Sequence, residues 1–276
     1  MLVAAVGTPL LVLACVGGLV ILAPARLGIG VGIVAAIGVG IAVNDREQTV
    51  RRSPVSPGEA PELHAVVERL CVLADIPKPE IVVETERQPN SWVVALSRGR
   101  ARLHVTRGLL DVLSPAELEA VIGHEIAHLA NRDAMVMTAV GGPGAVLLRG
   151  GRQAWHFGWY GGVAGIVAIA IGWLSRLGTQ SLSRHREIAA DAGSAALTGR
   201  PAALASALRK VSGELRLLPR EDLRVAAARD VFHLVPADDE LQRSRLTATH
   251  PPLAERIARL ERLERAMHAA RPAGLT

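Results

Sequence analysis

The stretch that decides the fold is Val121-Ile122-Gly123-His124-Glu125-Ile126-Ala127-His128, a His-Glu-x-x-His sequence. Ser114-Pro115-Ala116-Glu117 precedes it and has the pattern of a capping box with proline at the first helical position. Apolar residues recur at spacings of three and four, namely Leu118, Val121, Ile122, Ile126 and Leu129. The sequence therefore predicts a helix with one buried face.

His124 and His128 lie one turn apart on one side of this helix, so both imidazoles can reach a single metal ion. Glu125 projects beside them, within reach of a water on that ion. A His-Glu-x-x-His sequence also arises by chance, and the alternative is that these residues lie on the surface of an ordinary helix. The helical setting and the rest of the chain favour the metal site.

A catalytic zinc site takes three protein ligands and keeps one position open for water. The third ligand is expected to be a His or a carboxylate on another element, and Glu187 is our choice. Asp191 lies four residues further on the same helical face, where it can accept a hydrogen bond from a ligand imidazole. Small neighbours would let this helix approach the first one closely: Ala189, Ala190, Ala192 and Ala195.

With one zinc ion in place, these residues predict peptide hydrolysis without a covalent intermediate. The ion lowers the pKa of a bound water to about 7, and Glu125 takes its proton as the water attacks a polarised carbonyl. Glu125 can then pass that proton to the leaving amine.

The composition is that of a membrane protein with a soluble part. Of the 276 residues, 50% are hydrophobic but only 3% are aromatic. The net charge of +5 comes almost entirely from arginine, since Lys78 and Lys210 are the only lysines. Basic residues do not cluster with aromatic partners, which excludes a nucleic-acid-binding protein. Cys15 and Cys71 have neither metal-ligand nor disulfide spacing, which suits a reducing compartment.

Residues 1–43 are expected to form an N-terminal transmembrane hairpin. Two apolar runs, 2–22 and 27–43, are each near the length that crosses a bilayer. A cleaved signal peptide is the alternative for the first run, but a basic start is missing and the run is too long. Only Arg26 lies between the runs, whereas three arginines follow the second: Arg46, Arg51 and Arg52. By the positive-inside rule the domain that follows is cytosolic.

Residues 44–60 are expected to be a linker, followed by a domain of mixed secondary structure. The pattern predicts a helix over 61–76 and strands over 80–86, 91–97 and 101–106. Further helices are expected over 183–197, 201–217 and 253–270, while 225–240 is ambiguous. The fold class is mainly α with a small β-sheet (α+β), in a domain made of residues 61–133 and 176–270.

Residues 134–175 are expected to be a hydrophobic hairpin inserted into that domain. The run 134–148 is interrupted by Gly141-Gly142-Pro143-Gly144, and the run 157–174 has tryptophans near both ends. Arg149 and Arg152 lie between the two runs, on what would be the outer side. Full crossing and a re-entrant or interfacial hairpin therefore both stay open.

Taken together, the motifs resemble those of the HtpX-type integral-membrane zinc metalloproteases, which are related to the CAAX prenyl endopeptidases. The resemblance extends from the first apolar run to about Leu263. It is carried by Pro89-Asn90-Ser91-Trp92, residues 121–128 with Asn131 and Asp133, Ser183-Arg184-His185-Arg186-Glu187 with Ala190-Asp191, and Thr249-His250-Pro251-Pro252 with Glu255-Arg256-Ile257.

The resemblance implies a zincin-like catalytic domain with zinc on His124, His128 and Glu187, and with Glu125 as base. It also implies that a strand borders the cleft and pairs with substrate backbone through Asn90, Ser91, Trp92, Val93 and Val94. His250 would be a second-shell or transition-state group by the same resemblance. Ser91-Trp92 replaces the family's usual Ala-Phe, which leaves the shape of the substrate pocket open.

The hypothesis is a zinc endopeptidase of the plasma or inner membrane, with a cytosolic active site and polypeptide substrates, chiefly membrane proteins. The resemblance suggests quality control of damaged membrane proteins. The rivals are a processing protease for a single peptide or prenylated tail and a catalytically silent membrane scaffold. Asn131 and Asp133 are expected to cap or brace the helix that carries the motif, and we place Asn131 with Asp191 behind the metal ligands. The substrate, the oligomeric state and the roles of His185 and His104 stay open.

Overall fold

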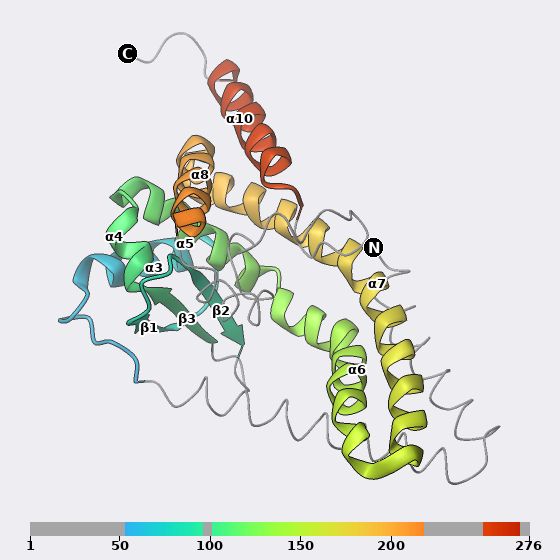
Figure 1. Ribbon diagram of the computed structural model, residues 1–276. Coiled ribbons are helices and arrows are strands. Elements are labelled where there is room, and N and C mark those ends of the chain that lie inside the picture. The colour runs from blue at the N-terminus through green and yellow to red at the C-terminus, as the bar shows by residue number, and fades with distance from the viewer. Residues whose placement is uncertain (1–52, 96–100, 218–250, 271–276) are drawn as a thin grey trace, which may run out of the picture. The chain divides into compact units, whose positions relative to one another are not determined.

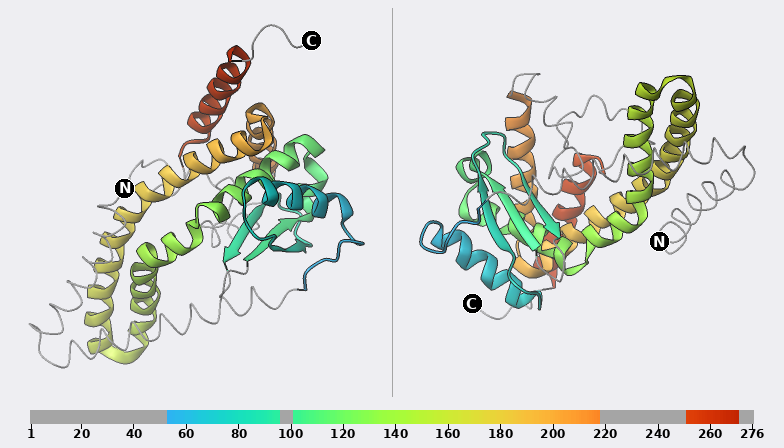
Figure 2. Two further views of the ribbon diagram at one scale, coloured as in Figure 1. Left: turned by 180° about the vertical axis from the view of Figure 1, so that it is seen from behind. Right: turned by 90° about the horizontal axis from the view of Figure 1, so that it is seen from below.

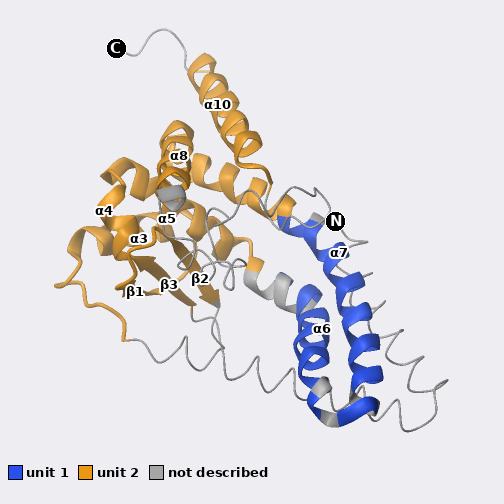
Figure 3. Ribbon diagram, viewed as in Figure 1, with its two compact units in different colours: residues 1–52, 135–183 blue, residues 53–134, 184–276 orange. Residues whose placement is uncertain are grey.

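A computed structural model describes residues 53–95, 101–217 and 251–270. The expected N-terminal hairpin, the ambiguous segment 225–240 and His250 lie outside these residues. The chain divides into two compact units (Figure 3): residues 1–52 with 135–183, and residues 53–134 with 184–276. The second unit carries the His-Glu-x-x-His helix, and we call it the catalytic unit.

The catalytic unit begins with α3 (Pro61–Leu73), which has proline in its first turn. This helix ends three residues before the predicted end at 76, because Asp75 adopts a positive φ of 52° that turns the chain. Pro77 and Pro79 then keep the following segment extended towards the first strand.

Three strands form the sheet: β1 (Glu80–Glu84), β2 (Ser91–Ala95) and β3 (Ala101–Thr106). Their order is β1-β3-β2, with β1 parallel and β2 antiparallel to the central β3. The three predicted strands are present, although β1 ends two residues early, and residues 96–97 of the second prediction lie outside the described residues. Because β2 is an edge strand of this sheet, one row of its backbone groups faces away from β3.

Helices cover one face of the sheet (Figure 1). The short α4 (Arg107–Val112), which the sequence pattern did not predict, follows β3 directly and leads to α5 (Pro115–Ala130). α5 packs against β2, α3 and α8 (Pro201–Leu217), and α8 packs against α10 (Leu253–Ala269). The core between them consists of fully buried aliphatic side chains, among them Val67, Leu70, Leu103, Val105, Ile122, Ile126, Leu204 and Leu208.

The other unit contains most of two long helices joined by a short 3-10 helix, Ala154–Phe157. α6 (Asp133–Gln153) runs through Pro143 and its flanking glycines without a break. α7 (Gly158–Thr198) is one helix of 41 residues, so the expectation of separate elements over 157–174 and 183–197 is wrong. The polar residues between those ranges include no proline, and serine or threonine alone does not end a helix.

α6 and α7 run side by side as a hairpin in both views of Figure 2. Their contact is made of small residues. A Cβ added at Gly172 would lie 2.9 Å from the Gly144 carbonyl oxygen, and one at Gly165 would lie 2.7 Å from the Gly151 carbonyl oxygen. Large apolar side chains of α7 are exposed instead, namely Trp159, Val163, Ile166, Trp173, Leu174 and Leu177.

Within the described part of the chain, one helix is long and apolar enough to cross a membrane: Gly162–Thr198. The guanidinium of Arg176 lies 5.5 Å from the ring centre of Trp173, a cation–π contact of the kind found where tryptophan and arginine sit at a membrane interface.

Candidate active site

The His-Glu-x-x-His motif lies in the buried middle of α5. Ser114 and Glu117 form the predicted capping box at the start of this helix, and both of its bonds are present. Every residue from Ala120 to Ala127 is buried, including His124 and Glu125, which are 2% and 4% exposed. The cap fixes where α5 begins, and the core holds one of its faces. Together they determine where the two histidines point.

α7 brings the second set of polar residues to α5. A Cβ added at Gly193 would lie 2.6 Å from the Ala127 Cβ, so only glycine fits this crossing. The next residue, Ser194, donates a hydrogen bond from Oγ to the carbonyl oxygen of Ala120 at 2.6 Å. Of the alanines expected at this contact, Ala190 and Ala195 are buried, whereas Ala189 and Ala192 are exposed.

His124, His128 and Glu187 converge, with one ligand atom from each within 4.8 Å of the others. The two Nε2 atoms are 3.0 Å apart. Glu187 oxygens lie 3.7 Å from His124 Nε2 and 3.5 Å from His128 Nε2. Ligands bound to zinc at 2.0–2.1 Å in a tetrahedron are about 3.4 Å from one another. The three separations bracket that value, so the geometry and the donor types both fit a zinc ion.

A carboxylate stands behind each histidine. Asp191 Oδ1 lies 3.0 Å from Nδ1 of His124, and Asp133 Oδ2 lies 2.6 Å from Nδ1 of His128. A carboxylate at Nδ1 keeps the proton on that nitrogen and turns Nε2 towards the ion. Asp191 therefore lies beside a ligand imidazole, as the sequence predicted. Of the two residues expected to cap or brace the helix, Asp133 lies behind His128, whereas Asn131 is exposed at the end of α5.

The charges around His128 favour its protonated form. Burial lowers the pKa of this imidazole, but the bond to Asp133 and the nearby Glu187 outweigh burial and raise it. For Asp133, burial raises the pKa of the carboxyl, and the bonds from His128 and Arg186 outweigh that effect and lower it. Metal binding needs neutral imidazoles, so an ion entering here would displace a proton.

Arg256 of α10 is the main contributor that the sequence analysis did not assign. Its side chain is 2% exposed and bonds Asp191 twice, through Nε at 2.9 Å and Nη2 at 2.7 Å. Its Nη1 lies 3.3 Å from Glu187 Oε2. The buried carboxylates hold the pKa of the guanidinium above its usual range despite the opposing effect of burial. The signal in the sequence was its place in the Glu255-Arg256-Ile257 motif, to which the resemblance assigned no role.

The edge strand β2 lies beside α5 and, with Asn90 directly before it, contains the residues predicted to bind substrate. Asn90 and Ser91 are buried, while Trp92, Val93 and Val94 are partly buried. Ser91 donates a hydrogen bond from Oγ to Glu125 Oε1 at 2.8 Å. Trp92 points to the opposite face and stacks on His104, with ring centres 4.8 Å apart. The sequence placed these residues on one strand but gave no sign that Ser91 reaches the base.

The open questions about two histidines are partly answered. His104 is fully buried, and its Nδ1 lies 2.9 Å from Glu84 Oε1, so it belongs to the sheet. His185 is exposed on α7 and is not in the metal-ligand cluster of the described residues. His250 lies outside those residues.

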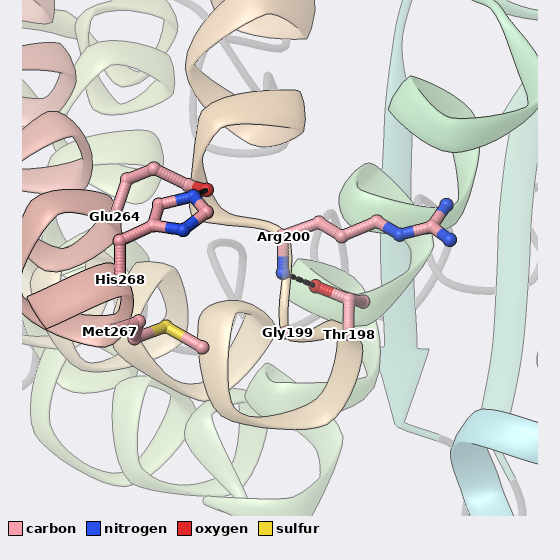
Figure 4. A pocket seen from close by; sticks show the side chains of 6 residues that line it. All are labelled: Thr198, Gly199, Arg200, Glu264, Met267 and His268. Carbon is pink, nitrogen blue, oxygen red and sulfur yellow. Dashed lines mark hydrogen bonds and ion pairs between the residues drawn. The ribbon is translucent and has the colours of Figure 1, made fainter. Parts of the chain in front are cut away.

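A hollow of about 490 Å³ lies elsewhere in the catalytic unit (Figure 4). It is lined by the end of α7, the turn to α8 and three residues of α10: Thr198, Gly199, Arg200, Glu264, Met267 and His268. It contains none of the metal-binding residues, and we place the chemistry at the His124 cluster, where donor types and distances agree.

Comparisons with known proteins match most of the chain. The model for peptidase family M48 matches residues 57–264. Protease HtpX homolog 2 of Methanosarcina acetivorans is 42% identical over 223 residues, covering 77% of this chain and 76% of the relative. The protease HtpX homolog of Moorella thermoacetica is 42% identical over 232 residues, covering 79% and 77%.

Among solved structures, the crystal structure of S. mikatae Ste24p matches with a TM-score of 0.51 at 17% identity. The match covers 88% of this chain and 63% of that one. At this identity the likeness concerns the fold alone. It confirms the expected fold class, mainly α with a small β-sheet.

Proposed function

The chain belongs to peptidase family M48, and from this premise we propose that it is a membrane-bound zinc endopeptidase with Glu125 as its general base. Family membership makes the protein a metalloprotease and confirms the resemblance seen in the motifs. The assignment of roles to individual residues rests on the geometry of the catalytic unit, as follows.

His124, His128 and Glu187 would hold one zinc ion, because their donor atoms are spaced as in a tetrahedral site. When bound, zinc polarises a carbonyl and lowers the pKa of water to about 7. Asp191 and Asp133 keep the imidazoles in the orientation and tautomer that expose Nε2.

Glu125 follows His124 directly and is 4% exposed, so its carboxylate lies in a region with little competing water. In the proposed reaction Glu125 accepts a proton from the water that attacks the scissile carbonyl. It then gives that proton to the amine nitrogen as the peptide bond breaks. The carboxylate ends the cycle ionised, and no covalent bond to the protein forms.

The substrate backbone would add as a further strand on the outer edge of β2, along residues 90–94. This edge suits the role because β3 occupies only one side of β2. His250 is carried over by resemblance as a group that stabilises the transition state.

A membrane setting is supported by the exposed apolar stripe of α7 and by the one described helix that could cross a bilayer. Within that setting we propose a cytosolic catalytic unit and a role in the quality control of membrane proteins. The positive-inside distribution of arginines and the resemblance to HtpX-type proteases support these two points.

The observation that carries the proposal is the convergence of His124, His128 and Glu187 with a carboxylate adjacent on α5. The test measures zinc content and casein cleavage of the detergent-purified protein, of Glu125→Gln and of Glu119→Gln. Glu119 lies on the same helix but pairs with Arg69, so its variant controls for loss of a carboxylate on α5.

We expect all three proteins to bind one zinc ion, and only Glu125→Gln to lose cleavage, by at least about 100-fold. Absence of zinc would overturn the site assignment. Zinc binding without cleavage by the parent would favour the scaffold, and cleavage of one sequence among several unrelated membrane substrates would favour the single-substrate processing enzyme.

A further inference from the structure

Ser91 connects the edge strand to the general base. Its hydroxyl donates to Glu125 Oε1 at 2.8 Å, and the two side chains are 1% and 4% exposed. A serine hydroxyl has one proton to donate, and an ionised carboxylate only accepts. The bond is therefore charge-assisted, a class roughly twice as strong as bonds between neutral groups.

The backbone next to Ser91 is held firmly. Asn90 N–H donates to Thr106 Oγ1 at 2.9 Å, and the Asn90 carbonyl accepts from Thr106 Oγ1 at 3.1 Å and from Thr106 N–H at 3.0 Å. Ser91 itself pairs with Val105 of the central strand. Because the strand is fixed in this way and the serine side chain is short, the Ser91 hydroxyl has little freedom to move. It can therefore hold the longer Glu125 side chain in one position.

Glu125 needs a hydrogen bond that fixes its position because its side chain has three rotatable bonds. A glutamate side chain loses rotamer entropy when it is ordered, and it is among the side chains that lose the most. A general base works only when it lies about 2.6–3.2 Å from the proton that it takes. With one oxygen held by Ser91, the second carboxylate oxygen is aimed in one direction.

We propose that Ser91 is a positioning residue that orients Glu125 for proton transfer, an inference that rests on the proposed function. The serine hydroxyl serves the base, and Ser91 contributes to substrate binding through its backbone alone. β2 thereby has two roles: its backbone edge pairs with the substrate, and the side chain of its first residue, Ser91, orients the general base.

The test uses three substitutions in the full-length protein. Ser91→Ala removes the hydroxyl. Ser91→Thr and Ser91→Val form a matched pair of nearly equal shape, of which only threonine retains the hydroxyl. Each variant is compared with the parent for kcat and KM on a fluorogenic peptide, zinc content and thermal unfolding.

We expect Ser91→Ala to lower kcat about ten-fold while KM changes less than about two-fold. The family's usual residue at this position is alanine, so a reduction is expected and not a complete loss. Zinc content and thermal unfolding should match the parent. Ser91→Thr should retain several-fold more kcat than Ser91→Val.

Ser194→Ala is the matched control, because it also removes a buried hydroxyl that bonds α5, at the Ala120 carbonyl. It should lower stability and leave kcat unchanged. The proposal would be overturned if Ser91→Ala had the kcat of the parent, or if its kcat fell only in proportion to a loss of zinc or of stability. Either result would leave the proposed function standing. A parent that binds zinc and cleaves nothing would overturn both.

Discussion

The α6–α7 hairpin and the crossing of α5 with α7 in the catalytic unit both use glycine to bring helices close together. In the hairpin, Gly165 and Gly172 lie against backbone carbonyls of α6. In the catalytic unit, Gly193 lies against Ala127. The spacing is similar, but what surrounds the contact differs.

Residues 134–183 include no aspartate or glutamate, and large apolar side chains point outwards there. The catalytic unit buries aliphatic side chains in a core and also buries Glu187, Asp191 and Arg256. In a bilayer the hydrophobic effect does not drive helices together, so close packing must hold a hairpin. In water the aliphatic core holds the fold, and the close crossing serves to assemble charges.

Arg256→Met offers the strongest test of that difference. It leaves Glu187 and Asp191 buried without their shared cation, which should lower the free energy of unfolding of the catalytic unit by about 3–5 kcal/mol. Arg259→Met on the same helix is the control. Arg259 is about half exposed, and its Nη2 lies 3.9 Å from Glu255 Oε1, so this surface ion pair is weak. Denaturant unfolding of both variants at pH 7 measures the effect. Equal stability of the two variants would show that the buried charges are not held by Arg256.

Residues 134–183 of the hairpin contain no carboxylate, so we expect their packing to depend chiefly on side-chain volume. Gly172→Leu would push into Leu148 and the Gly144 carbonyl, where even a Cβ would lie 2.6 Å and 2.9 Å from its neighbours. We expect a loss of up to about 3 kcal/mol in the helix contact, with faster amide exchange in α6 and α7 and unchanged zinc content. Ala170→Leu is an enlargement at an exposed position of the same helix and should be tolerated. Equal exchange in both variants would mean that the glycine contact does not hold the hairpin.

Much of the catalytic unit could be predicted from the sequence because its signals are local. The capping box at Ser114 and the apolar spacing after it fixed α5, and three short strands followed from turn residues and alternation. His124 and His128 were placed together because a spacing of four residues lies on one helical face. Glu187 was chosen from its own motif on another helix, and its carboxylate does converge with the two imidazoles.

The missing parts depend on tertiary contacts that no local pattern contains. Arg256 acts across 65 residues of sequence on Asp191, and Ser91 acts across 34 residues on Glu125. Asn131 and Asp133 both follow the motif closely, and only the turn after α5, where Arg132 has a φ of 54°, decides which of the two lies beside His128. The continuous α7 was missed since its polar middle resembles a helix end.

The smallest predicted effect is a difference in how the stability of the two regions depends on pH. Glu117 is buried on α5 and accepts bonds from Ser206 at 2.7 Å and Lys210 at 2.7 Å. Burial raises its pKa, but these bonds and those from Ser114 outweigh it and lower the pKa from 4.5 to about 2. The folded state therefore binds this proton less readily than the unfolded state. The resulting stability is fully present above about pH 4.5 and is lost as the pH falls towards 2.

Glu117→Gln should therefore unfold more easily than the parent at pH 7, by about 1 kcal/mol, because the half-exposed Lys210 is screened by water. The difference should shrink steadily below about pH 4.5. Glu62→Gln, at an exposed position of α3, controls for removal of a carboxylate and should unfold like the parent at pH 7. Urea unfolding of the three proteins with excess chelator measures this without interference from acid release of zinc. Amide exchange in residues 134–183 of α6 and α7 should show no matching change, since that range contains no aspartate or glutamate to protonate. A pH-independent difference for Glu117→Gln would mean that charge does not stabilise the contact of α5 with α8, and the contrast with the hairpin would then rest on Arg256 alone.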